Sequence, residues 1–380
     1  MTLHSQYPAI ADLRRRAQRR IPKFVWEYLD SGTGHEATKN HNRTALDRIR
    51  FAPSILHGEF EPDLSVNLFG ASFPLPFGVA PLGMSGLIWP NAEAHLAMAA
   101  AKAGLPYCLS TVATQSPEDL APHLGPQAWF QMYPPRDEGI RRDMLARAKA
   151  AGFTGLILTV DVPVASRRER QTRSGLTSPP KLTPRLLMQV AQRPAWALGM
   201  AQRGMPHMRM LDKYADAATK GLSPTAHVGY MLRTSPDWDY VKWLRDAWDG
   251  PFMIKGVLRG EDAEKLTALG VDALWVSNHA GRQFDAAPAS IEALPDVRSA
   301  TSLPILFDSG VEGGLDILRA WALGADFVML GRAFHFALAA VGPAGVDHLI
   351  DILHKDLVAN MGQMGVRDFS TRPPILDRQT

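Results

Sequence analysis

The sequence of 380 residues contains one cysteine, Cys108, and this scarcity limits the chemistry open to the chain. A single thiol excludes an intramolecular disulfide framework and a zinc site built from cysteines. Its neighbours from Leu105 to Leu109 are mostly apolar, which favours an inert buried thiol over a nucleophile. We therefore expect no metal site and a reducing, cytoplasmic location.

Long apolar runs and an excess of one charge are also missing. No segment has the length and apolarity of a membrane span, and the first residues lack the apolar core of a secretory signal. Lys and Arg number 41 against 38 Asp and Glu, too small an excess to indicate nucleic-acid binding. Hydrophobic residues make up 46% of the chain, which is enough for a large core.

A pattern of helix, glycine and apolar run recurs along the chain. Helix-like segments end at Gly104, Gly152, Gly270 and Gly324, each just before a short apolar run. Glycine accepts the left-handed conformation that stops a helix, and short apolar runs are typical of parallel strands buried on both faces. With four further runs the candidate strands number eight: Phe77–Ala80, Tyr107–Ser110, Ala128–Met132, Gly155–Asp161, Phe252–Lys255, Ala273–Ser277, Pro304–Asp308 and Asp326–Gly331.

Eight strands alternating with helices indicate the α/β class. Within this class they favour a single (β/α)₈ barrel, also called a TIM barrel, over an open doubly wound sheet. We expect all 380 residues to form one domain. Residues 1–70 would form an N-terminal helical cap. Residues 175–237 would form a long insertion after the fourth strand, which is typical of a lid, a partner contact or a linker.

Polar side chains follow these strands at their carboxyl ends: Gln131, Thr159, Asp161, Lys255, Ser277, His279 and Asp308. In a barrel these ends meet on one face, where catalytic residues belong. The loop 276–285 also brings together a base, a cation and an anion, His279, Arg282 and Asp285. A proton could be removed there from a substrate held by its own negative charge. A lone histidine would be assigned to a solvated loop, but the convergence favours function.

Several motifs match a known family. Residues 277–283, Ser-Asn-His-Ala-Gly-Arg-Gln, are close to the SNHGGRQ signature of the FMN-dependent L-2-hydroxy acid oxidases and dehydrogenases. That family includes glycolate oxidase, flavin-type L-lactate dehydrogenase and mandelate dehydrogenase. Residues 308–311 and 330–333 resemble its two phosphate-side motifs. The resemblance implies the same barrel, bound FMN and oxidation of an L-2-hydroxy acid to the 2-keto acid.

The resemblance assigns the catalytic groups. It makes His279 the active-site base and Asp161 the carboxylate that steadies its imidazolium, because a base that becomes cationic gains from a fixed anion. Arg282 and Arg168 correspond to the pair that clamps the substrate carboxylate through parallel hydrogen bonds. From spacing alone, Arg168 could equally be a surface arginine in a charged run.

The resemblance also describes the substrate pocket. Tyr28 and Tyr133 correspond to the two active-site tyrosines, which would otherwise be assigned to the core or rim. Val112 stands where glycolate-oxidase-like members have tryptophan, and Gly83 has no side chain. We therefore expect the pocket to admit acids bulkier than glycolate, from lactate to mandelate in size.

For the flavin, the resemblance places Lys255 beside the N1–C2 carbonyl edge of the ring, where a cation stabilises the anionic reduced form. A lysine at the end of a buried strand otherwise needs an explanation, because an unpaired buried charge is costly. Glycine-rich turns after the last two strands would let backbone N–H groups approach the phosphate. The implied cofactor contacts are Ala80, Leu82, Gly83, Ser110, Gln131, Thr159, Lys255, Ser277, Asp308, Gly310, Gly331 and Arg332.

Three further positions depart from the family pattern. Glu312 stands where arginine is usual on the phosphate side, and a carboxylate there should repel phosphate. We therefore expect Glu312→Arg to tighten FMN binding. Ala280 replaces a glycine beside the base and would strain the loop if that position needs a positive φ. Leu82 replaces a common threonine.

The insertion is basic, because residues 171–211 contain six Arg or Lys residues and no Asp or Glu. Interleaved apolar groups include Leu186-Leu187-Met188 and Trp196-Ala197-Leu198. A basic segment with Trp and Leu is typical of a membrane-surface anchor, while a lid or subunit contact is the other interpretation. Membrane-associated family members carry their anchor in this loop, which favours peripheral contact with the inner face of the cytoplasmic membrane through residues 175–211.

We expect a dehydrogenase that passes electrons from FMN to a quinone or another carrier, with an oxidase that uses O₂ and releases H₂O₂ as the alternative. A flavin-dependent isomerase on a related barrel and a non-catalytic protein without cofactor are interpretations from other classes. The joint presence of His279, Arg282, Lys255 and Asp161 disfavours the latter. The resemblance also implies a homo-oligomer, a tetramer.

Overall fold

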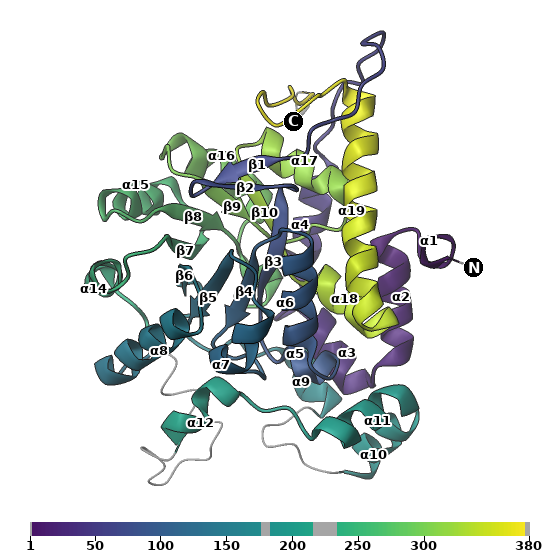
Figure 1. Cartoon of the computed structure of the whole chain (residues 1–380), viewed down its shortest axis with the longest axis vertical. Coiled ribbons are helices and arrows are strands. Elements are labelled where there is room, and N and C mark those ends of the chain that lie inside the picture. Colours follow the sequence, from purple (N-terminus) through teal and green to yellow (C-terminus); the bar gives the residue numbers. More distant parts are fainter. Residues whose placement is uncertain (1, 176–182, 216–233, 377–380) are drawn as a thin grey trace.

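The fold is taken from a computed structural model that describes residues 2–175, 183–215 and 234–376. Eight parallel strands close into a barrel in the order β10-β3-β4-β5-β6-β7-β8-β9 (Figure 1). They are β3 (Phe77–Leu82), β4 (Tyr107–Ser110), β5 (Ala128–Met132), β6 (Gly155–Thr159), β7 (Phe252–Val257), β8 (Ala273–Val276), β9 (Ile305–Phe307) and β10 (Phe327–Leu330). Each coincides with a predicted apolar run, so the TIM-barrel prediction is confirmed.

Helices surround the barrel between the strands. They are α5 (Ser85–Ile88), α6 (Ala92–Lys102), α7 (Pro117–Leu120), α8 (Glu138–Ala150), α14 (Trp238–Ala247), α15 (Gly260–Ala268), α16 (Ser290–Ser299), α17 (Gly314–Ala322), α18 (Arg332–Val341) and α19 (Pro343–Met364), with short 3₁₀ turns η1 (Ala121–His123) and η2 (His279–Gly281). The four glycines predicted to stop helices have φ between 66° and 123°. This left-handed backbone confirms their predicted role.

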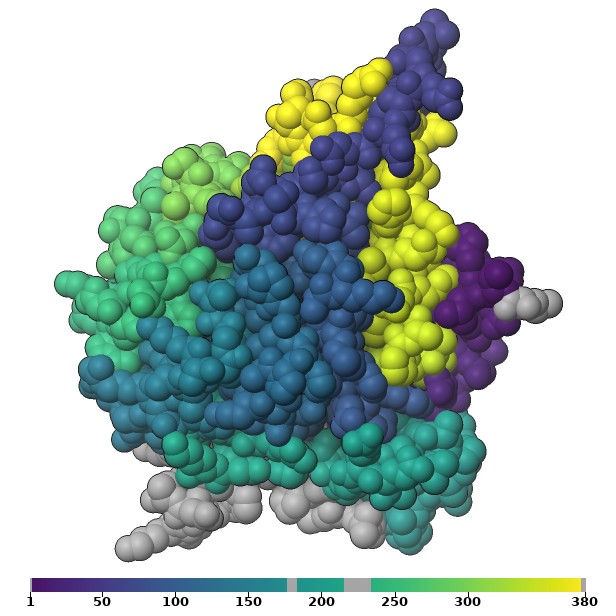
Figure 2. Space-filling view, viewed as in Figure 1, coloured from purple at the N-terminus to yellow at the C-terminus, as the bar shows by residue number. Residues whose placement is uncertain are grey.

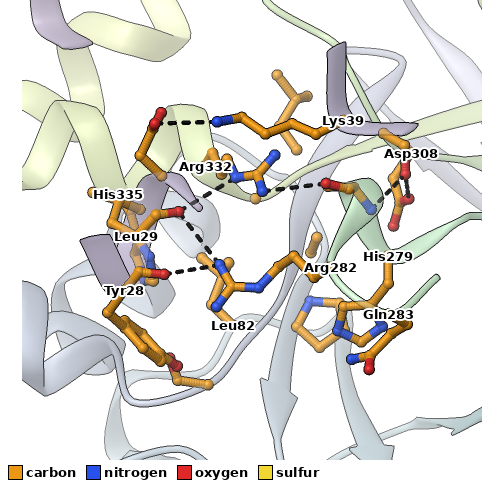
Figure 3. A pocket seen from close by; sticks show the side chains of 18 of the residues that line it. Tyr28, Leu29, Lys39, Leu82, His279, Arg282, Gln283, Asp308, Arg332 and His335 are labelled. Carbon is orange, nitrogen blue, oxygen red and sulfur yellow. Dashed lines mark hydrogen bonds and ion pairs between the residues drawn. The ribbon is translucent and has the colours of Figure 1, made fainter. Parts of the chain in front are cut away.

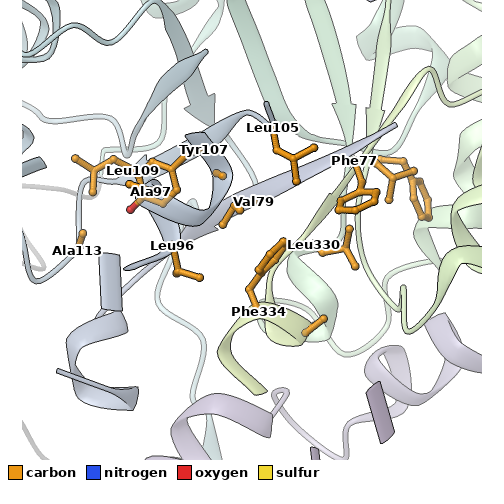
Figure 4. Close-up of a cluster of buried hydrophobic side chains, with 14 of the residues drawn as sticks. Phe77, Val79, Leu96, Ala97, Leu105, Tyr107, Leu109, Ala113, Leu330 and Phe334 are labelled. Atoms are coloured by element: carbon orange, nitrogen blue, oxygen red, sulfur yellow. The ribbon is translucent and has the colours of Figure 1, made fainter. Parts of the chain in front are cut away.

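Alternate side chains of the strands enter two separate cores. In β4, Tyr107 and Leu109 point outward to the helices, while Cys108 points into the barrel. The outer core packs β3 and β10 against α6 and α18, as Phe77, Leu96 and Phe334 show in Figure 4. The inner core contains apolar strand side chains that point into the barrel, including Trp129, Ile157, Met253, Trp275, Leu306 and Met329. Burial raises the pKa of the Cys108 thiol well above its usual value, as expected for an inert group.

The first 73 residues contribute to both ends of the barrel. Helices α1 (Leu3–Gln6), α2 (Ile10–Arg20), α3 (Lys23–Asp30) and α4 (Ala37–Asp47) come first, and α2 packs on α18. The antiparallel hairpin of β1 (Val66–Leu68) and β2 (Ala71–Phe73) closes the amino end of the barrel. There the ring centroids of Phe69 and Trp129 lie 5.9 Å apart.

The insertion lies at the other end, where the strands finish. It follows α9 (Glu169–Ser174), contains α10 (Pro184–Ala191), α11 (Pro194–Arg203) and α12 (Arg209–Ala215), and forms a teal rim along the lower edge of Figure 2. Trp196 is buried: its Nε1 donates to the Leu87 carbonyl at 2.9 Å, and its ring lies 5.8 Å from that of Phe24. Counting Trp196 as part of a membrane anchor was therefore wrong, because this large ring gains more by packing on α3.

In the part of the chain that the structure describes, no helix combines the length and the apolarity needed to cross a bilayer.

Candidate active site

A cavity of about 650 Å³ opens at the carboxyl ends of the strands. The strand register places Ser110 opposite Gln131 and Thr159 opposite Lys255 at this end. The cavity wall is completed by segments far away in sequence: α2–α4, the loops after β8 and β9, and the start of α18 (Figure 3). Polar groups that the barrel carries to one end are thus enclosed by the N-terminal helices.

The base and its carboxylate are in direct contact. His279 Nδ1 lies 3.0 Å from Asp161 Oδ1, and both side chains are largely buried. Burial lowers the pKa of the His279 imidazole, although Asp161 opposes this. Burial would raise the pKa of the Asp161 carboxyl, but His279 and Lys255 hold it below its usual value. A neutral imidazole beside an ionised carboxylate can accept a proton from a bound substrate.

Three successive left-handed residues carry the base into the cavity. His279, Ala280 and Gly281 have φ of 55°, 53° and 71°. Ala280 thus occupies a position of positive φ, which is the condition under which we expected an alanine there to strain the loop. Hydrogen bonds hold this turn: Ala280 N donates to Ser309 Oγ at 3.0 Å, and Gly281 N donates to Asn278 Oδ1 at 3.2 Å.

Arg282 is a buried cation without a carboxylate partner among the described residues. Its Nη1 donates to the carbonyls of Tyr28 and Leu29 at 3.0 and 3.3 Å. Burial, and then the neighbouring charges of Arg168 and Arg332, lower the pKa of the Arg282 guanidinium to about 9. Such a cluster of cations is stabilised by an anionic ligand.

Arg332, at the first position of α18, is held in the same way. It donates to the carbonyls of Leu29, Ser31 and Ala280 at 3.0–3.3 Å. Burial lowers the pKa of its guanidinium, and no carboxylate within the described ranges forms an ion pair with it. Helix α18 begins after Gly331 with no side-chain cap, so its first N–H groups remain available to an anion.

A row of hydrogen-bonded side chains crosses the floor of the cavity. Ser110 Oγ donates to Gln131 Oε1 at 2.8 Å, and Gln131 Nε2 donates to Thr159 Oγ1 at 2.9 Å. Lys255 Nζ lies 2.6 Å from Ser277 Oγ and 3.0 Å from Asp308 Oδ2. Asp308 thus supplies the partner that a buried lysine requires.

Most predicted site residues line the cavity. Three lie behind its wall and contact residues that line it: Asp161, Ser110 and Ser277. The others are Tyr28, Ala80, Leu82, Gly83, Val112, Gln131, Tyr133, Thr159, Arg168, Lys255, His279, Arg282, Asp308, Gly310, Gly331 and Arg332.

One side of the cavity is formed by Gly83, Val112 and Tyr28. The Tyr28 hydroxyl donates to the Gly83 carbonyl at 2.9 Å. A Cβ added to Gly83 would stand 2.8 Å from Val112 Cγ2 and 3.4 Å from the Tyr28 hydroxyl. A side chain at residue 83 would therefore clash with Val112, and glycine lets this part of the backbone line the cavity between Val112 and Tyr28.

Several lining residues received no role from the sequence: Arg14, Asn42, Met208, Gln283 and His335. Gln283 belonged to the recognised motif, and both atoms of its buried amide lack a hydrogen-bond partner among the described residues, as expected of a group that awaits a ligand. His335 Nε2 lies 2.8 Å from Ser85 Oγ, and burial lowers the pKa of its imidazole to about 3. The other three come from segments distant in sequence, and no local pattern marks them.

Among the residues that the structure describes, no cluster of three or more His, Cys, Asp or Glu side chains could hold a metal ion.

Comparisons with known proteins agree on one family. The family model for FMN-dependent dehydrogenases matches residues 17–375. An L-lactate dehydrogenase of Caulobacter vibrioides is 41% identical over 365 residues, covering 95% of this chain and 94% of the relative. Another, from Ectopseudomonas mendocina, is 40% identical and covers 95% and 96% of the two chains.

Solved structures give the same result. The monotopic membrane protein (S)-mandelate dehydrogenase has a TM-score of 0.91 and 34% identity, covering 97% of this chain and 98% of that chain. A mandelate oxidase has a TM-score of 0.81 and 31% identity, with the same coverage.

Proposed function

The chain belongs to the FMN-dependent dehydrogenase family, and from this premise we propose that it oxidises L-2-hydroxy acids between lactate and mandelate in size to 2-keto acids, with His279 as the base. The observation that carries the proposal is the buried Arg282, which lacks a carboxylate partner among the described residues and lies near Arg168 and the His279–Asp161 pair. A small carboxylate with a hydroxyl on the adjacent carbon matches this arrangement of charge and base.

The residues present fit FMN. Arg332 and the uncapped start of α18 suit a phosphate, and the Gln131–Thr159 row with Lys255 suits the polar edge of a flavin ring. Gly331 has no side chain, and a Cβ added there would be in tight contact with Leu82 Cδ2, at 3.1 Å, so glycine suits this position. When bound, FMN supplies the acceptor for the two electrons that leave the substrate.

The protein groups divide the remaining work. Arg282 and Arg168 orient the substrate through its carboxylate, Tyr28 and Tyr133 bound the space beside it, and His279 takes a proton. Asp161 stabilises the imidazolium that results, because its pKa stays below the usual value in the buried site. Orientation and a fixed counter-charge together lower the barrier to proton transfer.

The test is reduction of the bound flavin by substrate under anaerobic conditions, measured as the loss of flavin absorbance. L-lactate and (S)-mandelate should each bleach the flavin, whereas His279→Ala should bind FMN normally and bleach at least about 10²-fold more slowly. Full-speed reduction by His279→Ala would refute the role of the base. Failure of every 2-hydroxy acid to reduce the flavin would instead favour an isomerase.

The electron acceptor is proposed to be a quinone or another carrier. Mandelate dehydrogenase and mandelate oxidase both resemble this chain, so overall likeness does not choose between acceptors. Turnover with a quinone analogue should exceed turnover with dissolved oxygen, and little peroxide should form. Rapid stoichiometric peroxide production would establish the oxidase alternative.

We further propose that the exposed face of the insertion contacts a membrane surface. A solved relative is a monotopic membrane protein, and another structure is a soluble mutant of the membrane-associated enzyme from Pseudomonas putida. In this chain Leu187, Met188 and Leu198 are 53%, 63% and 61% exposed, and Arg185 and Arg203 are exposed on the same two helices. A homotetramer also remains a prediction, which light scattering can test.

A further inference from the structure

The phosphate end of the cavity contains a carboxylate where a cation is needed. Glu312 lines the cavity in the loop before α17 and its side chain is 46% exposed. A phosphate monoester carries nearly two negative charges at neutral pH. Arg332 supplies one full positive charge, and the start of α18 supplies about half of another. Because Glu312 removes one charge from this total, the site needs a second cation.

Two of the nearby cations are already neutralised. Lys39 Nζ lies 3.1 Å from Asp30 Oδ2 and 3.2 Å from Glu36 Oε2. Arg43 is held by Asp316 and Asp47, and its Nη1 also donates to the Gly310 carbonyl at 2.8 Å. Two carboxylates balance the charge of Lys39, and every nitrogen of the Arg43 guanidinium already donates to a carboxylate.

Arg14 is the remaining cation at this end among the described residues. It projects from α2 into the cavity lining, and its Nη2 donates to Asp30 Oδ1 at 2.8 Å. Its Nη1 lies 3.8 Å from Glu312 Oε1, too far for a hydrogen bond. The guanidinium carbon stands 5.7 Å from the centre of the Phe336 ring, which limits its movement on one side. Arg14 thus keeps donors available next to the carboxylate that needs to be offset.

We propose that Arg14, from a helix outside the barrel, is a ligand of the FMN phosphate and replaces the charge that Glu312 removes. Ion pairs with Asp30 and Glu312 hold the guanidinium at the rim, and its Nη1 and Nε make no hydrogen bond to a described residue, so both can donate to phosphate oxygens. Guanidinium and phosphate form charge-assisted hydrogen bonds that are stronger than neutral ones. The inference rests on FMN binding by the family and is independent of the choice of substrate.

The test compares FMN with riboflavin, which lacks the phosphate, in titrations of the apoprotein followed by flavin fluorescence. Arg14→Ala should raise the Kd for FMN about tenfold, as expected for loss of a hydrogen bond to a charged group, and change the Kd for riboflavin by less than about twofold. Arg14→Lys should retain part of the affinity. Raising the salt concentration should shrink the difference from wild type, because the charges are partly exposed.

The control is Arg15→Ala on the same helix. The Arg15 side chain is 67% exposed, pairs with Asp12 and does not line the cavity, so its loss should leave both affinities unchanged. The double variant Arg14→Ala/Glu312→Arg should bind FMN with nearly the wild-type affinity. This recovery would also show that a protein without the Arg14 side chain still folds.

Equal weakening of FMN and riboflavin binding, or no weakening of FMN binding, would overturn the proposal. So would failure of Glu312→Arg to rescue Arg14→Ala. A protein that passes these tests yet is not reduced by any 2-hydroxy acid would refute the proposed function alone.

Discussion

At the scale of single residues, the base is held by unfavourable backbone. Non-glycine residues in the left-handed region cost about 1–2 kcal/mol each, and both His279 and Ala280 lie there. The sequence raised the question only for Ala280, as a departure from a family motif that would be strained if the position needed a positive φ. The hydrogen bonds that maintain the turn come from Ser309 and Asn278, and Asn278 is in turn held by a reciprocal amide pair with Asn42 at 2.7 and 2.9 Å. No local pattern marks Asn42, because it lies 236 residues away.

Replacing Ala280 by glycine should relieve part of this strain. The gain of about 1–2 kcal/mol is reduced by the larger entropy of glycine in the unfolded chain, so we expect the free energy of unfolding to rise by about 0.5 kcal/mol. Urea unfolding of the apoprotein measures it. The matched control is Ala146→Gly on the exposed face of α8, which should destabilise by about 1 kcal/mol. A loss of stability in both variants would show that residue 280 does not require a left-handed backbone.

The pH dependence of substrate oxidation should report His279. The imidazole must be neutral to act as a base, so the rate should fall as the pH drops through a pKa below the ordinary value of about 6.5. In Asp161→Asn, burial, Lys255 and Arg168 still lower the pKa of His279 without the opposing carboxylate. The acid limb of kcat/KM should therefore move to lower pH, while the plateau falls by about 10²-fold or more. Movement of the limb to higher pH would contradict this.

At the scale of elements, local rules identified the strands and failed where tertiary packing decides. The apolar runs, four of them preceded by a glycine that stops a helix, located all eight strands of the barrel. The hairpin β1–β2 escaped prediction because strands of three residues are too short for an alternating pattern. In the insertion the apolar residues were recognised, but sequence could not separate those that pack inward from those that stay exposed. Leu186 is 7% exposed, whereas its neighbour Leu187 is 53% exposed.

The exposed face of α10 and α11 gives a prediction for membrane binding. Replacing Leu187, Met188 and Leu198 by serine should reduce binding to vesicles that contain anionic lipid by about tenfold or more, because burial of apolar side chains drives the contact. Cosedimentation is the measurement. A matched control replaces Ile55 and Leu56, which are 78% and 97% exposed in the loop between α4 and β1. If the control variant lost binding to the vesicles, or if the triple variant kept it, the membrane contact would lie elsewhere on the protein.

At the scale of the whole molecule, the cavity gathers positive charge that its ligands must balance. Arg168, Arg282 and Arg332 interact electrostatically, and none forms an ion pair with a carboxylate in the described part of the chain. Anions that bind only the folded protein should therefore stabilise it. The motifs in the sequence were enough to predict which arginines these are. The anchoring of Arg282 and Arg332 to carbonyls of α3 and of the residue just after it is visible only in the fold.

Thermal unfolding tests this balance. FMN at 100 times its Kd should stabilise the apoprotein by about 2.7 kcal/mol, and oxalate should stabilise the FMN-bound protein further. In Arg282→Met the effect of oxalate should disappear, while the effect of FMN remains. Equal stabilisation of both proteins by oxalate would mean that Arg282 does not bind the carboxylate.

The anchoring of these arginines has a consequence for biosynthesis. The Tyr28 carbonyl accepts a hydrogen bond from Arg282, which lies 254 residues later in the sequence. The Ser31 carbonyl accepts one from Arg332, which lies 301 residues later. Translation adds about 5–20 residues per second, so these arginines are synthesised roughly 15–60 s after the N-terminal helices. During that interval the apolar face of α2, which later packs on α18, remains uncovered. A nascent chain should therefore need protection from aggregation, and flavin capture should be among the last events of its maturation.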